Sequence, residues 1–299
     1  MKRVIVFGMG SGPMKVLSWL SSHATIVAVV MPWCKSDEDL EPALTWAKEH
    51  RILILRQGNE KEDGLRDAIT ILEADIGVIC SYPLRIPENI ISIPPLGIIN
   101  IHGGKLPQYR GPHVLQWAII NGDKEVGITL HYIDKDFDSG DVVATTKLYI
   151  RQNEDAAKIY KRMIAADARL LSRCWQGLTD GTAKRLPQDA RKATYWRRRY
   201  PQDGLINWAD SAKDIHNLIR ALVKPWPGAF SYIDGNKVVI NKSVVIAKED
   251  VEKSKKKGII ITTGDGLLLV TQATIRQQRY NGRQLRRLLV GKIFQGEDK

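Results

Sequence analysis

The stretch Leu96-Gly97-Ile98-Ile99-Asn100-Ile101-His102-Gly103 decides how the first part of this chain folds. Its apolar start, bounded by prolines and glycines, predicts a buried parallel strand. Side chains alternate along a strand, so Asn100 and His102 are expected on one face at its carboxyl end. Ligands bind at the carboxyl ends of strands in open α/β sheets, so this polar pair is expected where chemistry occurs.

Strand-like and helix-like patterns alternate from residue 2 to about residue 150. Further strands are expected over Arg3–Phe7, Thr25–Val30, Ile52–Leu55, Ile76–Cys80, Gly127–Ile133 and Val142–Leu148. Helices are expected over Pro13–Ser22, Leu40–His50, Glu62–Glu73, Val114–Ile120 and Asp155–Gln176. This alternation is typical of a doubly wound α/β domain.

The pattern changes in the last third of the chain. Residues 180–201 are rich in charge, glycine and proline, which is typical of an interdomain linker. A helix is expected over Ser211–Val223. Short alternating strands follow over Ala229–Ile233, Lys237–Ile240, Ile259–Thr262 and Leu267–Thr271, joined by Asp-Gly turns at 234–235 and 265–266. They predict a small β-barrel, so we expect domains over 1–185 and 201–299 with a linker at about 186–200.

Composition excludes several classes of protein. With 299 residues and 43% apolar content, the chain is expected to be globular with a real core. Its apolar runs are too short to span a bilayer and its start does not resemble a secretory signal, so we expect no membrane insertion and a cytoplasmic location. Cys34, Cys80 and Cys174 are widely spaced, which favours buried small apolar residues over a disulfide framework or a zinc site.

A net charge of +12 suits nucleic acid, a membrane surface or a phosphate-bearing small substrate, and does not choose among them. The basic run at 253–257 lies between two expected strands and is interpreted as a solvated hairpin loop. The run Arg197, Arg198 and Arg199 continues into Tyr200. Arginines interleaved with aromatic residues can pair with phosphates and stack on a base, so this run is a candidate binding site, with a solvated surface as the alternative.

Three other patterns are set aside as sites. Gly8, Gly10 and Gly12 follow the first strand, but the next residue is Pro13, which favours a tight turn over a dinucleotide site. The Asp134-x-Asp136-x-Asp138 pattern starts like a calcium loop, but its twelfth position is a threonine, so no metal is expected. The histidines without metal-binding spacing are interpreted as surface or structural residues; they are His23, His50, His113, His131 and His216.

The residues around Asn100 and His102 carry a resemblance. The Asn-x-His pair is followed by a Leu-Pro-x-Tyr-Arg-Gly turn at 106–111 and by Asp138-Ser139-Gly140. This order resembles the signature of the formyltransferases that depend on 10-formyltetrahydrofolate. The similarity extends to residues 116–122, 127–131 and 224–230. It implies an α/β fold with a doubly wound, Rossmann-like formyltransferase domain, followed by a small OB-like β-barrel domain.

The resemblance also implies site residues. Asn100 would donate a hydrogen bond to the oxyanion formed when an amine attacks the formyl carbon. His102 would act as acid and base, and Asp138 would raise the pKa of His102. No metal is implied. The folate contacts carried over are Leu84, Arg85, Ile86, Asp134, Lys135, Asp136, Phe137 and Asp138. Glycine at position 104 replaces the usual serine, and this change is expected to alter the lip of the pocket.

The acceptor amine is the open question. Glycinamide ribonucleotide formyltransferases lack a barrel and match poorly. Methionyl-tRNA formyltransferases share both domains but carry a basic loop after the second strand, where this chain has the acidic stretch 31–39. The tRNA substrate is therefore disfavoured and kept as an alternative.

The favoured acceptor is a nucleotide-linked amino sugar used for surface polysaccharides, with UDP slightly preferred over dTDP on analogy alone. Residues 200–208 resemble that subgroup, and Arg197, Arg198, Arg199 and Tyr200 are the candidate contacts to the nucleotide diphosphate. An amino acid carried by a peptide synthetase and a non-catalytic nucleotide-binding module stay as further alternatives. A homodimer is compatible with the sequence, which does not predict the oligomeric state.

Overall fold

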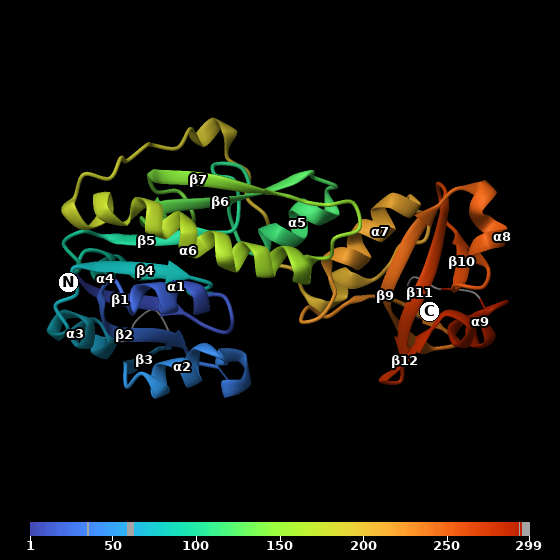
Figure 1. Cartoon of the computed structure of the whole chain (residues 1–299), viewed down its shortest axis with the longest axis horizontal. Helices are drawn as coiled ribbons and strands as arrows, with labels where there is room; N and C mark the ends of the chain where they lie inside the picture. The colour runs from blue at the N-terminus through green and yellow to red at the C-terminus, as the bar shows by residue number, and fades with distance from the viewer. Residues whose placement is uncertain (35, 59–62, 293, 295–299) are drawn as a thin grey trace. The chain divides into compact units, whose positions relative to one another are not determined.

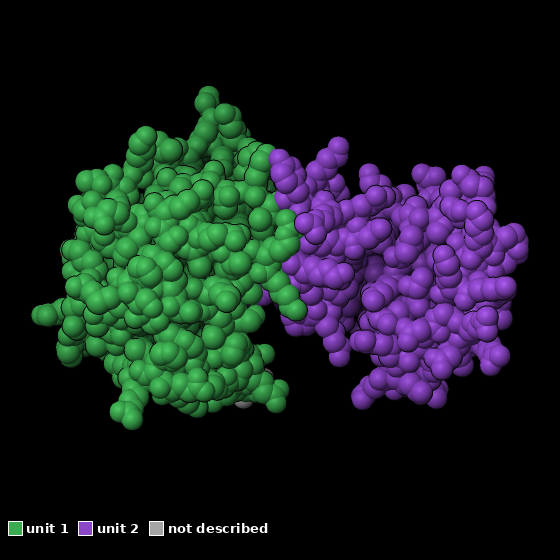
Figure 2. Space-filling view, viewed as in Figure 1, with its two compact units in different colours: residues 1–114, 126–148, 161–197 green, residues 115–125, 149–160, 198–299 purple. Residues whose placement is uncertain are grey.

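The chain forms two compact units (Figure 2). The computed structural model describes residues 1–34, 36–58, 63–292 and 294. The first unit comprises residues 1–114, 126–148 and 161–197, and the second comprises 115–125, 149–160 and 198–299. Each unit is therefore built from segments that are far apart in the sequence.

A seven-stranded sheet forms the centre of the first unit, in the order β3-β2-β1-β4-β5-β6-β7 (Figure 1). Its strands are β1 (Arg3–Gly8), β2 (Thr25–Pro32), β3 (Leu53–Gln57), β4 (Ile76–Cys80), β5 (Ile98–His102), β6 (Glu125–Tyr132) and β7 (Val142–Tyr149). Strands β1 to β5 pair in parallel, and β6 pairs antiparallel to β5. The predicted doubly wound α/β fold is confirmed, and the carboxyl ends of β1, β4 and β5 share one edge.

Helices connect successive strands of this sheet: α1 (Met14–Leu20), α2 (Ala43–Glu49), α3 (Asp63–Ile71), α4 (Glu88–Ile91) and α5 (Val114–Ile120). The long helix α6 (Ala156–Asp180) follows β7. Single turns of 3-10 helix are η1 (Asp37–Leu40), η2 (Ala190–Lys192) and η3 (Pro201–Gly204). The helix expected over 40–50 is divided, because Glu41 is extended before Pro42 and α2 can begin only after the proline. The expected start of α3 at Glu62 lies outside the described residues.

The core of the first unit follows from the apolar strands. Buried side chains of β1 and β2, including Phe7 and Val30, pack with Leu65 and Ile69 of α3. The turn after β1 is tight, as predicted: Gly10 has a φ of +63°, and a Cβ on Gly8 would lie 2.8 Å from the carbonyl oxygen of Cys80. Of the three cysteines, Cys80 is buried as expected, whereas Cys34 and Cys174 are half-buried.

An antiparallel, curled sheet forms the second unit, with the order β10-β11-β9-β8 and with β12 paired to β11. Its elements are α7 (Ala212–Ala221), β8 (Ala229–Ile233), β9 (Asn236–Ile246), η4 (Lys248–Asp250), α8 (Val251–Ser254), β10 (Ile259–Thr262), β11 (Leu267–Ile275), β12 (Gln278–Asn281) and α9 (Gly282–Leu289). The predicted barrel-like domain is confirmed, and Asp234 and Gly235 both have positive φ, as a tight hairpin turn requires.

Three features of the second unit differ from expectation. Strands β9 and β11 are longer than expected, and β12 and α9 had no clear signal in the sequence. The basic run at 253–257 includes the end of α8 and is not a simple hairpin loop. Within the described ranges, no helix combines the length and the apolar character needed to cross a bilayer.

Residues 186–196, which we call the strap, lie within the segment expected to be a linker. They belong to the first unit. Leu186 exchanges two backbone hydrogen bonds with Val142 of β7, at 2.9 and 3.0 Å. Tyr195 forms a parallel bridge with Arg110, in the turn after β5. The strap therefore links the edge of the sheet to the turn that carries the Leu-Pro-x-Tyr-Arg-Gly sequence.

Candidate active site

Four polar side chains meet at the carboxyl end of β5. Asn100 and His102 lie on β5, His131 lies on β6, and Asp138 follows β6. The Asp138 Oδ1 atom lies 3.4 Å from His102 Nδ1, 3.6 Å from His131 Nε2 and 3.3 Å from Asn100 Nδ2. The structure thus brings together the amide, imidazole and carboxylate that the sequence singles out.

His102 has a hydrogen-bond acceptor at each ring nitrogen. Its Nε2 atom lies 2.7 Å from the carbonyl oxygen of Tyr109, and its Nδ1 atom faces Asp138. Only the imidazolium form satisfies both acceptors, but burial disfavours this charge and lowers the pKa of His102. Asp138 contributes in the predicted direction by raising that pKa, although burial is the larger effect.

Asp138 is held ionised by its neighbours. Its Oδ2 atom accepts a hydrogen bond of 2.9 Å from the backbone N–H of Gly111, and its φ of +55° lies in the left-handed region. Burial raises the pKa of this carboxyl, but His102, His131 and the Gly111 N–H together outweigh burial and bring the pKa to about 2. The side chain is thus a carboxylate throughout the neutral range.

His131 is the member of the cluster that sequence reasoning missed. Its side chain is fully buried, and its Nδ1 atom donates to the carbonyl oxygen of Tyr132 at 2.7 Å. In the neutral ring, Nε2 is therefore an acceptor, and it lies 3.2 Å from Asn100 Nδ2. The antiparallel register of β5 and β6 places Asn100 opposite His131. The sequence would have pointed to His131 only if the antiparallel direction and the register of β6 had been predicted.

Gly104 packs closely against His102. A Cβ at this position would lie 2.6 Å from His102 Nε2 and 2.6 Å from the carbonyl oxygen of Tyr109. A serine here would therefore displace the imidazole or the turn that carries Tyr109. The glycine that replaces the usual serine of the signature thus preserves the contact between His102 and the Tyr109 carbonyl.

The strap holds the turn that faces His102. The Thr194 hydroxyl accepts a hydrogen bond from the backbone N–H of Tyr109. The Thr194 carbonyl oxygen accepts one from the backbone N–H of Arg110. The ring of Tyr109 stacks on Trp196, with ring centroids 5.4 Å apart. Because the Tyr109 carbonyl and the Gly111 N–H contact His102 and Asp138, the strap supports both residues through this turn.

The two segments expected to contact folate are connected to each other. The Arg85 guanidinium donates a hydrogen bond to the carbonyl oxygen of Lys135, and Gln57 donates to the carbonyl oxygen of Arg85 at 2.8 Å. Leu84 is half-buried, whereas Ile86 is buried in the core of the first unit. Ile86 therefore supports this loop from inside, and direct contact with a ligand stays a prediction for all three residues of the loop.

The loop at 134–138 is ordered by its own side chains. Asp134 accepts hydrogen bonds from the backbone N–H of Asp136 at 3.1 Å and from the Ser139 hydroxyl at 2.5 Å. Phe137 is 56% exposed, and Lys135 and Asp136 are also exposed. This arrangement leaves an aromatic face and backbone groups available for a flat heterocycle.

In the sequence, the arginine run spans the point where the chain passes from the first unit to the second. Arg197 ends the first unit, and Arg198 begins the next segment of the second. Within the second unit, the Arg199 guanidinium lies 4.6 Å from the centre of the Trp117 ring and donates to the Asp203 carbonyl oxygen. Tyr200 is 60% exposed. Arg199 therefore has structural partners, and phosphate binding by this run stays a prediction.

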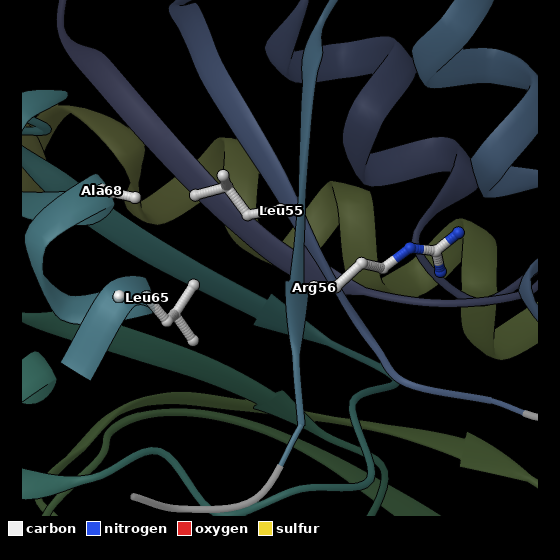
Figure 3. Close-up of a pocket in the computed structure, with 5 residues that line it drawn as sticks. Leu55, Arg56, Leu65 and Ala68 are labelled. Atoms are coloured by element: carbon white, nitrogen blue, oxygen red, sulfur yellow. The ribbon is translucent and has the colours of Figure 1, made fainter. Parts of the chain in front are cut away.

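A separate recess lies between β3 and α3, lined by Leu55, Arg56, Gly64, Leu65 and Ala68 (Figure 3). Its lining is mostly apolar, and the Arg56 side chain points away from Leu65 (Figure 3). The Arg56 guanidinium instead pairs with Asp37 at 3.2 Å. The described residues that line this recess include no acid–base pair, and the recess is distinct from the Asn100 cluster.

Comparison with known proteins gives the chain its family. The formyl transferase family matches residues 2–174, and the formyl transferase C-terminal domain matches residues 199–287. The chain belongs to the formyl transferase family. It is an enzyme that transfers formyl groups from a formyl-folate.

Individual relatives differ in their named roles. The methionyl-tRNA formyltransferase of Acetivibrio thermocellus is 31% identical over 247 residues, which is 80% of this chain and 79% of the relative. The bifunctional polymyxin resistance protein ArnA of Wigglesworthia glossinidia brevipalpis is 36% identical over 213 residues, which is 71% of this chain but 32% of ArnA.

Solved structures share the fold at low identity. An N-formyltransferase from Helicobacter canadensis, solved with folinic acid and dTDP-3-aminofucose, has a TM-score of 0.67 and 20% identity, covering 94% of this chain and 100% of that chain. HypX from Aquifex aeolicus has a TM-score of 0.65 and 17% identity, covering 97% of this chain and 49% of that chain. At these identities the likeness concerns the fold.

Proposed function

We propose that this enzyme transfers the formyl group of 10-formyltetrahydrofolate to the amine of a nucleotide-linked amino sugar. The observation that carries the choice of acceptor is the acidic segment after β2. Asp37, Glu38 and Asp39 form the first turn of η1, and the nearby Arg56 is already paired with Asp37. A surface of this sign repels the phosphates of a nucleic acid. Lys35 in the same segment lies outside the described residues.

Two features of the sequence support a sugar nucleotide. Identity to ArnA reaches 36% over 71% of this chain, and the motifs around Asn100 and His102 resemble those of the enzymes that act on UDP-amino-arabinose. Residues 200–208 also resemble that subgroup, and η3 at Pro201–Gly204 gives this segment a defined shape. The preference for UDP over dTDP rests on this similarity.

Methionyl-tRNA is the second candidate acceptor. Methionyl-tRNA formyltransferases are 30–32% identical over 77–90% of this chain. The net charge of +12 also suits an RNA partner. Both observations are outweighed in our proposal by the acidic segment at the place where the tRNA enzymes carry a basic loop.

In the proposed mechanism, Asn100 stabilises the negative charge that develops on the formyl oxygen. The two acceptors on Asn100 Nδ2 lie at 3.2 and 3.3 Å, the long end of the hydrogen-bond range. Exchanging one of these weak bonds for a shorter bond to the developing oxyanion therefore costs little. His131 and Asp138 meanwhile keep the Nδ2 side of the amide turned toward the cluster.

His102 moves the protons of the reaction. The Asp138 carboxylate stabilises a proton at Nδ1, while Nε2 exchanges a proton with the reacting groups in place of its hydrogen bond to the Tyr109 carbonyl. The lowered pKa of His102 makes the neutral ring available as a base at neutral pH, and Asp138 stabilises the imidazolium that follows. Bound formyl-folate supplies the electrophilic carbon.

The loop residues fit a folate. The exposed ring of Phe137 and the half-buried Leu84 offer apolar contacts, and the backbone of 134–138 offers the peptide groups that a pterin edge requires. These residues are the ones proposed to hold the cofactor.

The deciding experiment is a turnover assay with 10-formyltetrahydrofolate against UDP- and dTDP-linked amino sugars, with methionyl-tRNA in parallel. Turnover on a sugar alone supports the proposal and identifies the nucleotide. Turnover on tRNA alone refutes the sugar proposal, and silence on both favours an amino acid on a peptide synthetase or a non-catalytic role. Loss of turnover in a folded His102→Ala variant separates enzymatic transfer from background.

The arginine run is tested in the same assay. Arg198→Glu is expected to raise the Michaelis constant for the sugar nucleotide without changing that for folate. Lys256→Glu, an exposed charge reversal in the run at 253–257, serves as the matched control. Equal Michaelis constants in the two variants would assign the arginine run to a solvated surface.

A further inference from the structure

Gln188 in the strap uses every hydrogen-bonding position of its side-chain amide. Its Nε2 atom donates to the carbonyl oxygens of Asp138 at 2.9 Å and of Gly140 at 2.7 Å. Its Oε1 atom accepts from Arg110 Nε at 3.1 Å and from Arg110 Nη2 at 2.8 Å. One side chain thus joins the Asp138 loop to the turn after β5.

The orientation of this amide is fixed by the charge and chemistry of its partners. Arg110 is 4% exposed and can only donate, so Oε1 must face the guanidinium. The two carbonyl oxygens can only accept, so the amino group must face Asp138 and Gly140. Arg110 also donates to the Tyr195 hydroxyl at 2.6 Å, which holds the guanidinium against the strap.

Asp138 needs this kind of support because its backbone is strained. A left-handed φ of +55° is unfavourable for a residue with a side chain, and neighbouring contacts must hold it there. Gln188 holds its carbonyl oxygen, while the Gly111 N–H holds its carboxylate. These two contacts fix Asp138 at both ends and so set its distance from His102.

We propose that Gln188 is a positioning residue for formyl transfer, which acts by holding Asp138 against His102. The proposal rests on the roles proposed above for those two residues and is independent of which amine accepts the formyl group. It predicts that the amino group of Gln188, and not its oxygen alone, is needed for the reaction.

Two variants separate this role from simple packing. Gln188→Met keeps the length of the side chain, adds no charge and removes all four hydrogen bonds. Gln188→Glu keeps an acceptor for Arg110 and loses the two donors to Asp138 and Gly140. The matched controls are Gln278→Met and Gln278→Glu, because Gln278 is exposed on β12 and its side-chain oxygen accepts from the Tyr280 hydroxyl.

The first readout needs no acceptor substrate. Histidine titration by NMR of the folded full-length protein, with the His102 signal assigned from a His102→Gln variant, reports the Asp138–His102 contact. In Gln188→Met the pKa of His102 is expected to fall further, by on the order of 1 unit, because Asp138 no longer supports the imidazolium. The Gln278→Met control should titrate like the native enzyme. An unchanged His102 titration in folded Gln188→Met overturns the proposal.

The second readout is kinetic, with the acceptor that the turnover assay identifies. Both Gln188 variants should lose about 100-fold in kcat, with the Michaelis constants for folate and acceptor close to native, because a displaced Asp138 affects the chemical step. If Gln188→Glu keeps native kcat while Gln188→Met loses it, Gln188 acts through Arg110 alone and the proposal is wrong. If either variant fails to fold, the His102 titration is repeated with Gln188→Ala, in which the pKa of His102 is also expected to fall.

Discussion

Asp138 and Asp167 are both largely withdrawn from solvent in the first unit, and their environments have opposite effects. Asp138 is surrounded by His102, His131 and the Gly111 N–H, and its pKa falls to about 2. The side chain of Asp167 on α6 has no hydrogen bond or ion pair within the described part of the chain, and burial raises its pKa to about 8. Burial alone therefore decides little: the partners determine whether a carboxyl is kept as an anion or as an acid.

The contrast also separates a site from its surroundings. The charge of Asp138 is stabilised by groups that the proposed reaction uses, whereas Asp167 has no described group to stabilise its own charge. Burial, and after it the charge of Asp167, raises the pKa of the Cys80 thiol. One carboxyl contributes stability when ionised and the other costs stability when ionised. Four measurements test this difference, beginning with the largest expected effect.

Replacing Asp138 by asparagine should lower kcat by about 10³-fold, because the imidazolium of His102 loses its counter-charge while the shape of the loop is kept. Asp180→Asn, at the exposed end of α6, is the control and should keep native kcat. Steady-state kinetics with the identified acceptor measure the effect. Native turnover in Asp138→Asn would mean that the charge of this carboxyl has no part in the reaction.

Replacing Asp167 by asparagine should stabilise the protein at alkaline pH. The folded pKa of about 8 lies above the ordinary value of 3.8, so the native state binds the extra proton and loses stability as pH rises between these values. The gain in the free energy of unfolding should be on the order of 5 kcal/mol at pH 8.5 and less than about 1 kcal/mol at pH 4. Urea unfolding at the two pH values measures it. A gain independent of pH would contradict the assignment to the buried charge.

Replacing Gly140 by alanine tests how tightly the Asp138 loop is packed. A Cβ here would lie 2.1 Å from the carbonyl oxygen of Tyr132, so the loop must move, at a cost of about 2 to 3 kcal/mol in the free energy of unfolding and with a clear loss of kcat. Gly64→Ala of α3 meets no atom within 4 Å and should gain about 0.5 to 1 kcal/mol. Thermal melting and kinetics of the pair measure both effects, and equal behaviour would show that the loop is loosely packed.

The stability that Asp138 contributes should disappear in acid. Its folded pKa of about 2 lies below the ordinary value of 3.8, so the contribution is fully present above pH 4 and is lost as pH falls through 2. The loss should be about 2 kcal/mol. Asp138→Asn should remove this part of the pH dependence, as measured by urea unfolding between pH 5 and pH 2.5. A native-like acid slope in the variant would assign the slope to other groups.

Periodicity predicted most of the fold because the strands and helices bury regular apolar faces. Val114–Ile120 and Ala229–Ile233 match their expected bounds, and the Asp-Gly turns lie where the residue types require them. The antiparallel direction of β6 and the short elements β12 and α9 were not predicted, because pairing with distant strands determines them and local pattern does not.

Only the site residues that belong to the recognisable sequence motif were predicted. Asn100, His102 and Asp138 carry recognisable signals, and the structure brings them together. His131 and Gln188 carry none on their own, because their positions depend on strand register and on a segment that returns from far along the chain. The raising effect of Asp138 on the pKa of His102 was predicted, but the larger, lowering effect of burial was not, because a sequence does not display burial.

The strap has a consequence for how the enzyme is made. Eighty-five residues separate Tyr109 from the threonine hydroxyl that receives its backbone hydrogen bond. On the ribosome, β5 can pair with β4 long before that threonine emerges, since domains begin to fold as their N-terminal parts are synthesised. A nascent chain that stops short of residue 194 therefore presents Asn100 and His102 on a finished sheet without the part of the strap that orders the facing turn. Catalytic competence is acquired late in translation, well after the Rossmann-like sheet has formed.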